Sequence, residues 1–69
     1  MKISARNVLK GKVIGVSEGV VNTEVVLQLT GGAKVVSIIS KASAKKLGLK
    51  PGKKAYAIIK ASNVMMAVD

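Results

Sequence analysis

The sequence of 69 residues contains no cysteine, histidine, phenylalanine or tryptophan, and its single aromatic residue is Tyr56. Without cysteine and histidine, neither a disulfide nor the usual zinc site can form. A domain of this size buries only about 60% of its extended surface, and here no large ring fills the core. Small scaffolds without such supports usually depend on a partner chain, so we expect an oligomer.

Acidic residues are also scarce. Eleven lysines and one arginine stand against three carboxylates, those of Glu18, Glu24 and Asp69, and the net charge is +9. No acid–base pair and no nucleophile with its base is visible, so we predict that the protein is not an enzyme. A positive excess attracts anions in general: nucleic acid, anionic lipid or small oxyanions.

Long apolar runs are missing too. No stretch approaches the ~20 residues that cross a bilayer, and the N-terminus lacks the apolar core of a secretory signal. The absence of cysteine fits a reducing compartment. We therefore expect a soluble, cytoplasmic protein without a membrane partner, folded as one domain over residues 1–69.

Short runs of β-branched residues separated by glycine are typical of a small all-β domain. Alternation and turn residues predict strands over residues 7–16, 20–29, 34–40, 54–60 and 63–68, with a short helix over 40–47. In the second of these strands one face, which we expect to be buried, carries Val21, Thr23, Val25, Leu27 and Leu29. Ser40 and Gly48 are predicted to cap the two ends of the helix, and Lys50-Pro51-Gly52-Lys53 predicts a type II turn. Five strands with a helix after the third are typical of an OB-like barrel, the fold of many oligonucleotide- and oligosaccharide-binding domains. The strand over 34–40 is apolar on both faces, which indicates that a second subunit covers the outer one.

Near the N-terminus, Ser4-Ala5-Arg6-Asn7 offers a hydroxyl, a guanidinium and an amide with no carboxylate nearby. In an extended segment Ser4 and Arg6 share a face. Together with a backbone N–H they could hold a compact oxyanion through charge-assisted hydrogen bonds. Taken alone, however, a Ser-x-Arg stretch is more often a plain exposed strand start than an anion site.

The first thirteen residues, Met-Lys-Ile-Ser-Ala-Arg-Asn-Val-Leu-Lys-Gly-Lys-Val, resemble the molbindin (Mop) family of small molybdate-binding proteins. Residues 19–25, 37–40, 47–52 and 59–65 resemble it as well, so the likeness covers nearly the whole chain. The resemblance implies an OB-like barrel whose subunits exchange strand contacts. It also implies a homohexamer, arranged as a trimer of dimers, with oxyanion sites between the subunits. The implied function is intracellular storage or homeostasis of molybdate.

The resemblance also implies which residues form the sites. In the first site, the stretch Ser4, Ala5 and Arg6 of one chain meets Lys60, Ala61 and Ser62 of another. Relatives often carry serine at the position of Ala61, so one hydroxyl is absent here. The resemblance also implies a second site near a symmetry axis, for which we expect the backbone of Gly19 and Val20 together with Asn22 and either Ser40 or Ser43.

The chemistry of molybdate fits the first set. Molybdate is a tetrahedral dianion without a proton at neutral pH, so its site needs donors only, whereas monohydrogen phosphate needs an acceptor. Tungstate nearly matches molybdate in radius and charge, and the sequence does not separate the two. The alternative function is a single-stranded nucleic-acid binding module on an OB-type barrel. Base stacking on aromatic rings carries ~1–3 kcal/mol per base, and one tyrosine makes nucleic acid an unlikely partner.

Overall fold

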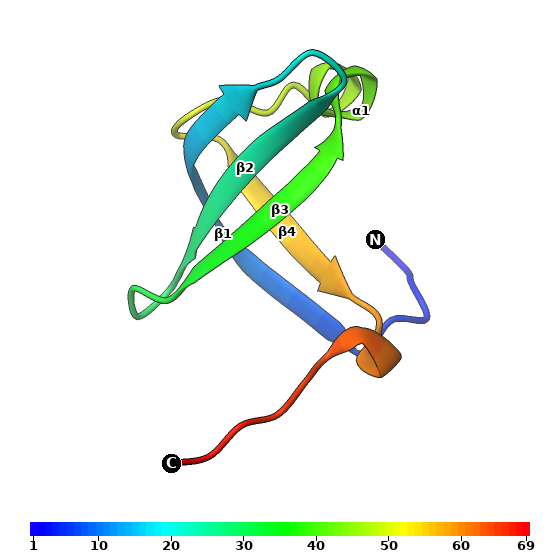
Figure 1. Cartoon of the computed structure of the whole chain (residues 1–69). Helices are drawn as coiled ribbons and strands as arrows, with labels where there is room; N and C mark the ends of the chain where they lie inside the picture. The colour runs from blue at the N-terminus through cyan, green and yellow to red at the C-terminus, as the bar shows by residue number, and fades with distance from the viewer.

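The computed structural model describes all residues, 1–69, and forms one four-stranded antiparallel sheet with a single α-helix (Figure 1). The strand order across the sheet is β3-β2-β1-β4. No helix is long and apolar enough to cross a membrane. The elements along the chain are β1 (Asn7–Glu18), β2 (Asn22–Leu29), β3 (Lys34–Ser40), α1 (Lys41–Leu47), β4 (Lys54–Ile59) and the 3₁₀ turn η1 (Ala61–Asn63).

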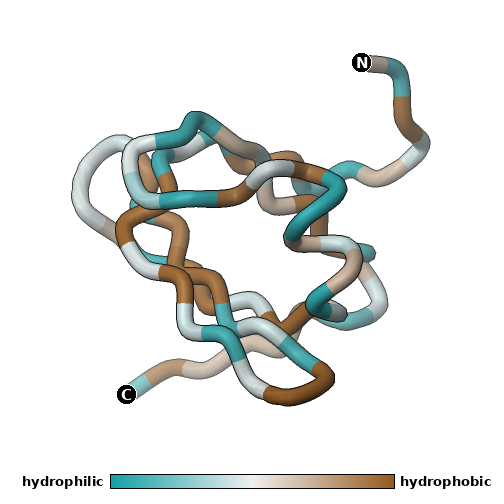
Figure 2. The backbone as a smooth tube through the Cα atoms, turned by 90° about the horizontal axis from the view of Figure 1, so that it is seen from above, coloured by the Kyte–Doolittle hydropathy of each residue, from teal (hydrophilic) through white to brown (hydrophobic).

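Strand β1 is long because it serves two neighbours. Its first half pairs with β4 and its second half with β2, and the β1–β2 register shifts between Val13 and Gly15. A bulge of this kind bends a strand and increases its twist. At Gly11 a Cβ atom would lie 2.5 Å from the Gln28 carbonyl oxygen, so the close approach of β1 and β2 requires glycine. The sheet therefore curls into a half-barrel, which Figure 2 shows end-on as a ring.

The core is small, as the missing aromatic rings predicted. Val13, Val25, Leu27 and Ala44 are the buried apolar residues, and Thr23 is the buried polar one. The predicted inward face of β2 is confirmed for Thr23, Val25 and Leu27. The predicted start of that strand at residue 20 is wrong, because residues 20–21 lie in the turn that follows the longer β1.

The predicted helix signals are confirmed. The Ser40 hydroxyl accepts a hydrogen bond from the Ser43 N–H at 3.0 Å and so caps α1. Gly48 ends the helix in the left-handed region at φ 64°, which glycine adopts without a steric cost. The Lys53 ammonium donates to the Leu47 carbonyl oxygen at 2.7 Å and satisfies one of the last helical acceptors.

The predicted fifth strand over residues 63–68 is wrong for the single chain. After β4 the chain enters η1, where the Asn63 N–H donates to the Lys60 carbonyl at 2.8 Å. The turn directs residues 64–69 away from the sheet, where they reach no strand edge and form no regular structure (Figure 1). The fold is thus a four-stranded half-barrel rather than a closed five-stranded barrel.

Candidate functional site

The first candidate site lies where β1 begins and β4 ends. Asn7 and Ile59 are register partners, and the Asn7 side-chain amide also donates to the Ile59 carbonyl oxygen at 3.2 Å. Arg6 precedes this pair on one strand and Lys60 follows it on the other. Because the strands are antiparallel, the chain segments that carry both cations leave the sheet at the same end, where η1 follows β4 (Figure 1).

The structure therefore brings the two predicted stretches, residues 4–6 and 60–62, to one end of a single chain. The four side chains with charges or hydroxyls are all exposed, namely Ser4, Arg6, Lys60 and Ser62. The backbone N–H groups of Ala61 and Ser62 donate to no backbone carbonyl, since the first η1 bond begins at the Asn63 N–H. The resulting end of the sheet is rich in donors and free of carboxylates.

The second predicted set gathers at the opposite end of the sheet. The Gly19 N–H donates to the Asn22 carbonyl at 2.7 Å, and Asn22 is the register partner of Ser40. The Lys41 N–H donates to the Val21 carbonyl at 2.9 Å, so the β1–β2 turn lies against the start of α1. Val20, at the tip of the turn, is exposed.

The Ser40 hydroxyl, a predicted member of this set, is already engaged as the predicted cap of α1. It accepts the cap hydrogen bond from Ser43 and donates to the Ser43 hydroxyl oxygen at 2.8 Å. The hydrogen left for an external anion is therefore that of the Ser43 hydroxyl. The Glu18 carboxylate lies 3.8 Å from the Lys41 ammonium close to this end, which makes the second set less favourable to an anion than the first.

The chain contains no group of three or more histidine, cysteine, aspartate or glutamate side chains that could hold a metal ion. The end at Arg6 and Lys60 offers a ligand hydrogen-bond donors and positive charge, whereas the second end also carries the Glu18 carboxylate. Donors and positive charge suit an oxyanion, because hydrogen bonds to a charged partner are shorter and stronger than neutral ones.

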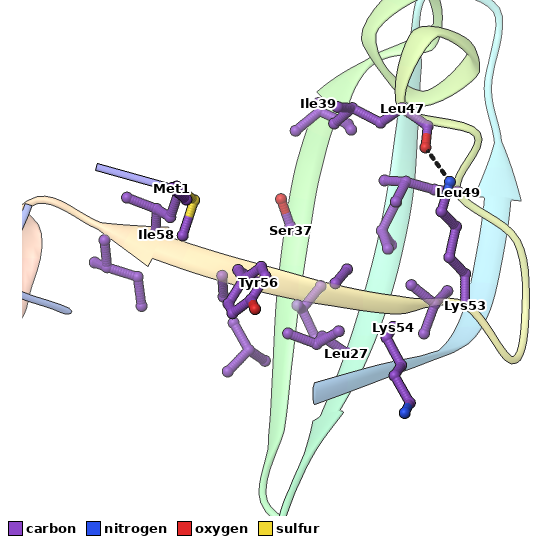
Figure 3. A pocket seen from close by; sticks show the side chains of 17 residues that line it. Met1, Leu27, Ser37, Ile39, Leu47, Leu49, Lys53, Lys54, Tyr56 and Ile58 are labelled. Atoms are coloured by element: carbon purple, nitrogen blue, oxygen red, sulfur yellow. Dashed lines mark hydrogen bonds between the residues drawn. The ribbon is translucent and has the colours of Figure 1, made fainter. Parts of the chain in front are cut away.

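A feature that sequence reasoning did not locate is an apolar trough between β3 and β4, strands that do not pair with each other (Figure 3). Its volume is about 710 Å³, and 14 of its 17 lining residues are hydrophobic. It opens directly onto the core residues Val13, Val25 and Leu27. The signal that could have found part of it was the apolar pattern of β3, which contributes Val35, Val36 and Ile39 to the lining.

Comparison with known proteins places this architecture in a class. A family model described as the TOBE domain matches residues 3–66, nearly the whole chain. The molybdenum-pterin-binding protein 1 of Clostridium pasteurianum is 53% identical over 66 residues, which cover 96% of this chain and 97% of that protein.

Solved structures agree with the sequence comparison. MopII from Clostridium pasteurianum superimposes with a TM-score of 0.93 at 51% identity, covering 97% of this chain and 100% of its own. ModG, described as a cytoplasmic molybdate-binding protein and solved with molybdate bound, gives a TM-score of 0.91 at 49% identity, covering 94% of this chain and 46% of its own. The chain belongs to the TOBE-domain family and, within it, to the molybdenum-pterin-binding (Mop) proteins, which confirms the resemblance found in the sequence.

Proposed function

We propose that this protein binds molybdate, and tungstate as its near-isostere, at subunit interfaces and serves intracellular storage or homeostasis of the oxyanion. The observation that carries the proposal is the full-length likeness to Mop proteins together with the structure of ModG holding molybdate. A cytoplasmic location is proposed on the same ground, because ModG is described as cytoplasmic. The protein acts as a binder and not as a catalyst.

The donor-rich end of the sheet supports the assignment of the first site. Arg6 and Lys60 supply positive charge, Ser4 and Ser62 supply hydroxyls, and the backbone N–H groups of Ala5 and Ala61 complete the set. Each hydrogen bond to a charged group contributes roughly 1.5–3 kcal/mol net. Six of them contribute roughly 9–18 kcal/mol, which exceeds the roughly 8 kcal/mol of a micromolar complex and leaves a margin for desolvation of the dianion.

The chain exposes more surface than a compact monomer of its mass, and this excess supports self-association. The accessible surface is 5601 Å². A compact monomer of 7.1 kDa is expected to expose only about 4,100 Å². The excess of about 1,500 Å² approaches twice the ~800 Å² that one partner contributes to a standard interface. We propose that this surface is covered in a homohexamer arranged as a trimer of dimers.

The C-terminal segment, residues 64–69, is the proposed means of strand exchange. Met65, Met66 and Val68 are 93%, 89% and 97% exposed, although their side chains are apolar. The trough between β3 and β4 offers two free strand edges and an apolar floor. The segment of one subunit would lie in the trough of another as its fifth strand and bury apolar surface on both.

Two measurements test the proposed site. Calorimetric titration with molybdate, tungstate, sulfate and phosphate should show micromolar binding of the first two and at least tenfold weaker binding of phosphate. Arg6→Ala should abolish high-affinity binding, whereas Lys50→Ala, which removes the same charge from the turn after α1, should leave it within about twofold. Molybdate binding no tighter than chloride binding would refute the function. An Arg6→Ala variant that binds normally would refute the site.

The oligomer is tested separately by removing residues 64–69. We expect the shortened chain to run as a smaller species in sedimentation and to bind dyes specific for exposed apolar surface. A shortened chain with the mass of the full-length assembly would contradict strand exchange.

A further inference from the structure

A row of lysines crosses the outer face of the sheet. Lys12 on β1 is the register partner of Lys54 on β4 and of Gln28 on β2, and Gln28 is in turn the partner of Lys34 on β3. All four side chains are exposed, and Lys10 lies on the same face two residues before Lys12. We call Lys10, Lys12, Lys34 and Lys54 the lysine row.

The lysine row has no counterion in its own chain. Like charges directly opposite each other on neighbouring strands are destabilising, and Lys12 and Lys54 stand in this relation. The single ion pair of the chain joins Glu18 to Lys41 on another part of the surface. Glu24 lies four residues from Gln28 along β2, about 14 Å at the rise of an antiparallel strand. The repulsion within the row is therefore left for an external anion to relieve.

The surface between these lysines is hollowed. A shallow recess of about 420 Å³ is lined by Lys10, Lys12 and Lys54 together with the polar side chains of Gln28 and Thr30, and only one of its seven lining residues is hydrophobic. Figure 3 shows Lys54 directed away from its neighbour Lys53, which turns back toward α1. Side chains with ammonium, amide and hydroxyl groups thus line the recess, and no carboxylate is among them.

We propose that this recess binds a small molecule carrying a chain of linked phosphate groups. Lysine supplies compact point charges on flexible stems, without the planar fork by which arginine grips one oxyanion. The Cα atoms of Lys12 and Lys54 are separated by one strand spacing, about 5 Å, and those of Lys10 and Lys12 by about 7 Å along the strand. Charges spread in this way match several linked anionic groups better than one tetrahedral ion.

A strand of nucleic acid also carries linked phosphates, but the face is poorly suited to it. Binding of single strands uses successive aromatic rings on which neighbouring bases stack. Tyr56, the register partner of Lys10, is the single aromatic residue of the protein. The proposed ligand is therefore a free oligophosphate, and its site is separate from the donor-rich end at Arg6 and Lys60.

The test is calorimetry of the intact assembly with inorganic tripolyphosphate at about 0.1 M salt. Lys12→Gln and Lys54→Gln should each weaken binding at least tenfold. Lys46→Gln, which removes the same charge from exposed α1, should change it less than twofold. Molybdate titration of the same three variants should be unaltered, so failure of this proposal leaves the molybdate proposal standing.

Thermal stability gives a second readout. Without ligand, Lys12→Gln should melt at a higher temperature than the unaltered protein, because it removes the repulsion from Lys54. Saturating tripolyphosphate should reverse the order. If Lys12→Gln, Lys54→Gln and Lys46→Gln all weaken tripolyphosphate binding equally, the binding is a general effect of surface charge and the proposed site is wrong. Tighter binding of a thymidine oligonucleotide than of tripolyphosphate would overturn the choice of ligand.

Discussion

The Asn7 side-chain amide donates to the Ile59 carbonyl oxygen at 3.2 Å, joining two residues that lie 52 positions apart in the sequence. This bond fastens the terminal register pair of β1 and β4, in which Asn7 directly follows Arg6 and Ile59 directly precedes Lys60. The bond therefore fixes the strand ends from which Arg6 and Lys60, the charge carriers of the proposed oxyanion site, extend, and it does so through a neutral amide that need not touch the ligand.

Replacing Asn7 by alanine tests this positioning role. The half-buried hydrogen bond contributes about 1 kcal/mol, and its loss frees the ends of both strands. We expect the free energy of unfolding to fall by about that amount and molybdate affinity to fall severalfold in calorimetry. Asn63→Ala is the matched control, because the Asn63 side chain is exposed and makes no hydrogen bond. Equal losses in both variants would contradict the role.

Ala61→Ser should strengthen molybdate binding. The substitution restores a hydroxyl donor at the exposed start of η1, next to the Ser62 hydroxyl. One additional hydrogen bond to a charged group is worth roughly 1.5 kcal/mol at the low end, about a tenfold gain in affinity. Ala42→Ser, on the exposed surface of α1, adds the same group elsewhere and should leave the dissociation constant unchanged.

Two substitutions at Ser40 separate its capping role from anion binding. Ser40→Ala removes the cap of α1 and should lower stability by about 1 kcal/mol in urea unfolding. Ser40→Asp retains a capping oxygen but adds a negative charge beside Asn22. If the second site exists, Ser40→Asp should remove that class of molybdate sites while stability stays close to the original. Unchanged stoichiometry in Ser40→Asp would exclude the second site.

Thr23→Val should stabilise the protein. The Thr23 side chain is completely buried, and its hydroxyl oxygen has no hydrogen-bond partner. A buried polar group without a partner costs about 1–3 kcal/mol, and a methyl group of similar size removes that cost. We expect a gain of about 1 kcal/mol in chemical unfolding. A loss of stability would mean that the hydroxyl has a partner in the assembled protein.

The local structure was predictable because short-range chemistry determines it. Ser40 and Gly48 mark the ends of α1, since a side-chain cap and a left-handed φ are needed there whatever the rest of the chain does. Pro51 and Gly52 likewise predicted a type II turn, and the structure has Gly52 at φ 94° with the Lys53 N–H donating to the Lys50 carbonyl at 3.1 Å. Alternation along β2 identified its buried face for the same local reason.

The sequence by itself determined these elements, the excess of donors over acceptors and, through its resemblance, the family. Only the tertiary structure decided that residues 64–69 are not a strand of their own sheet, because a strand forms only where an unpaired edge lies within reach. It also decided which distant residues become neighbours. The register of β1 and β4 pairs Lys12 with Lys54 and places Arg6 and Lys60 at the same end of the sheet, a relation between far segments that no local pattern encodes.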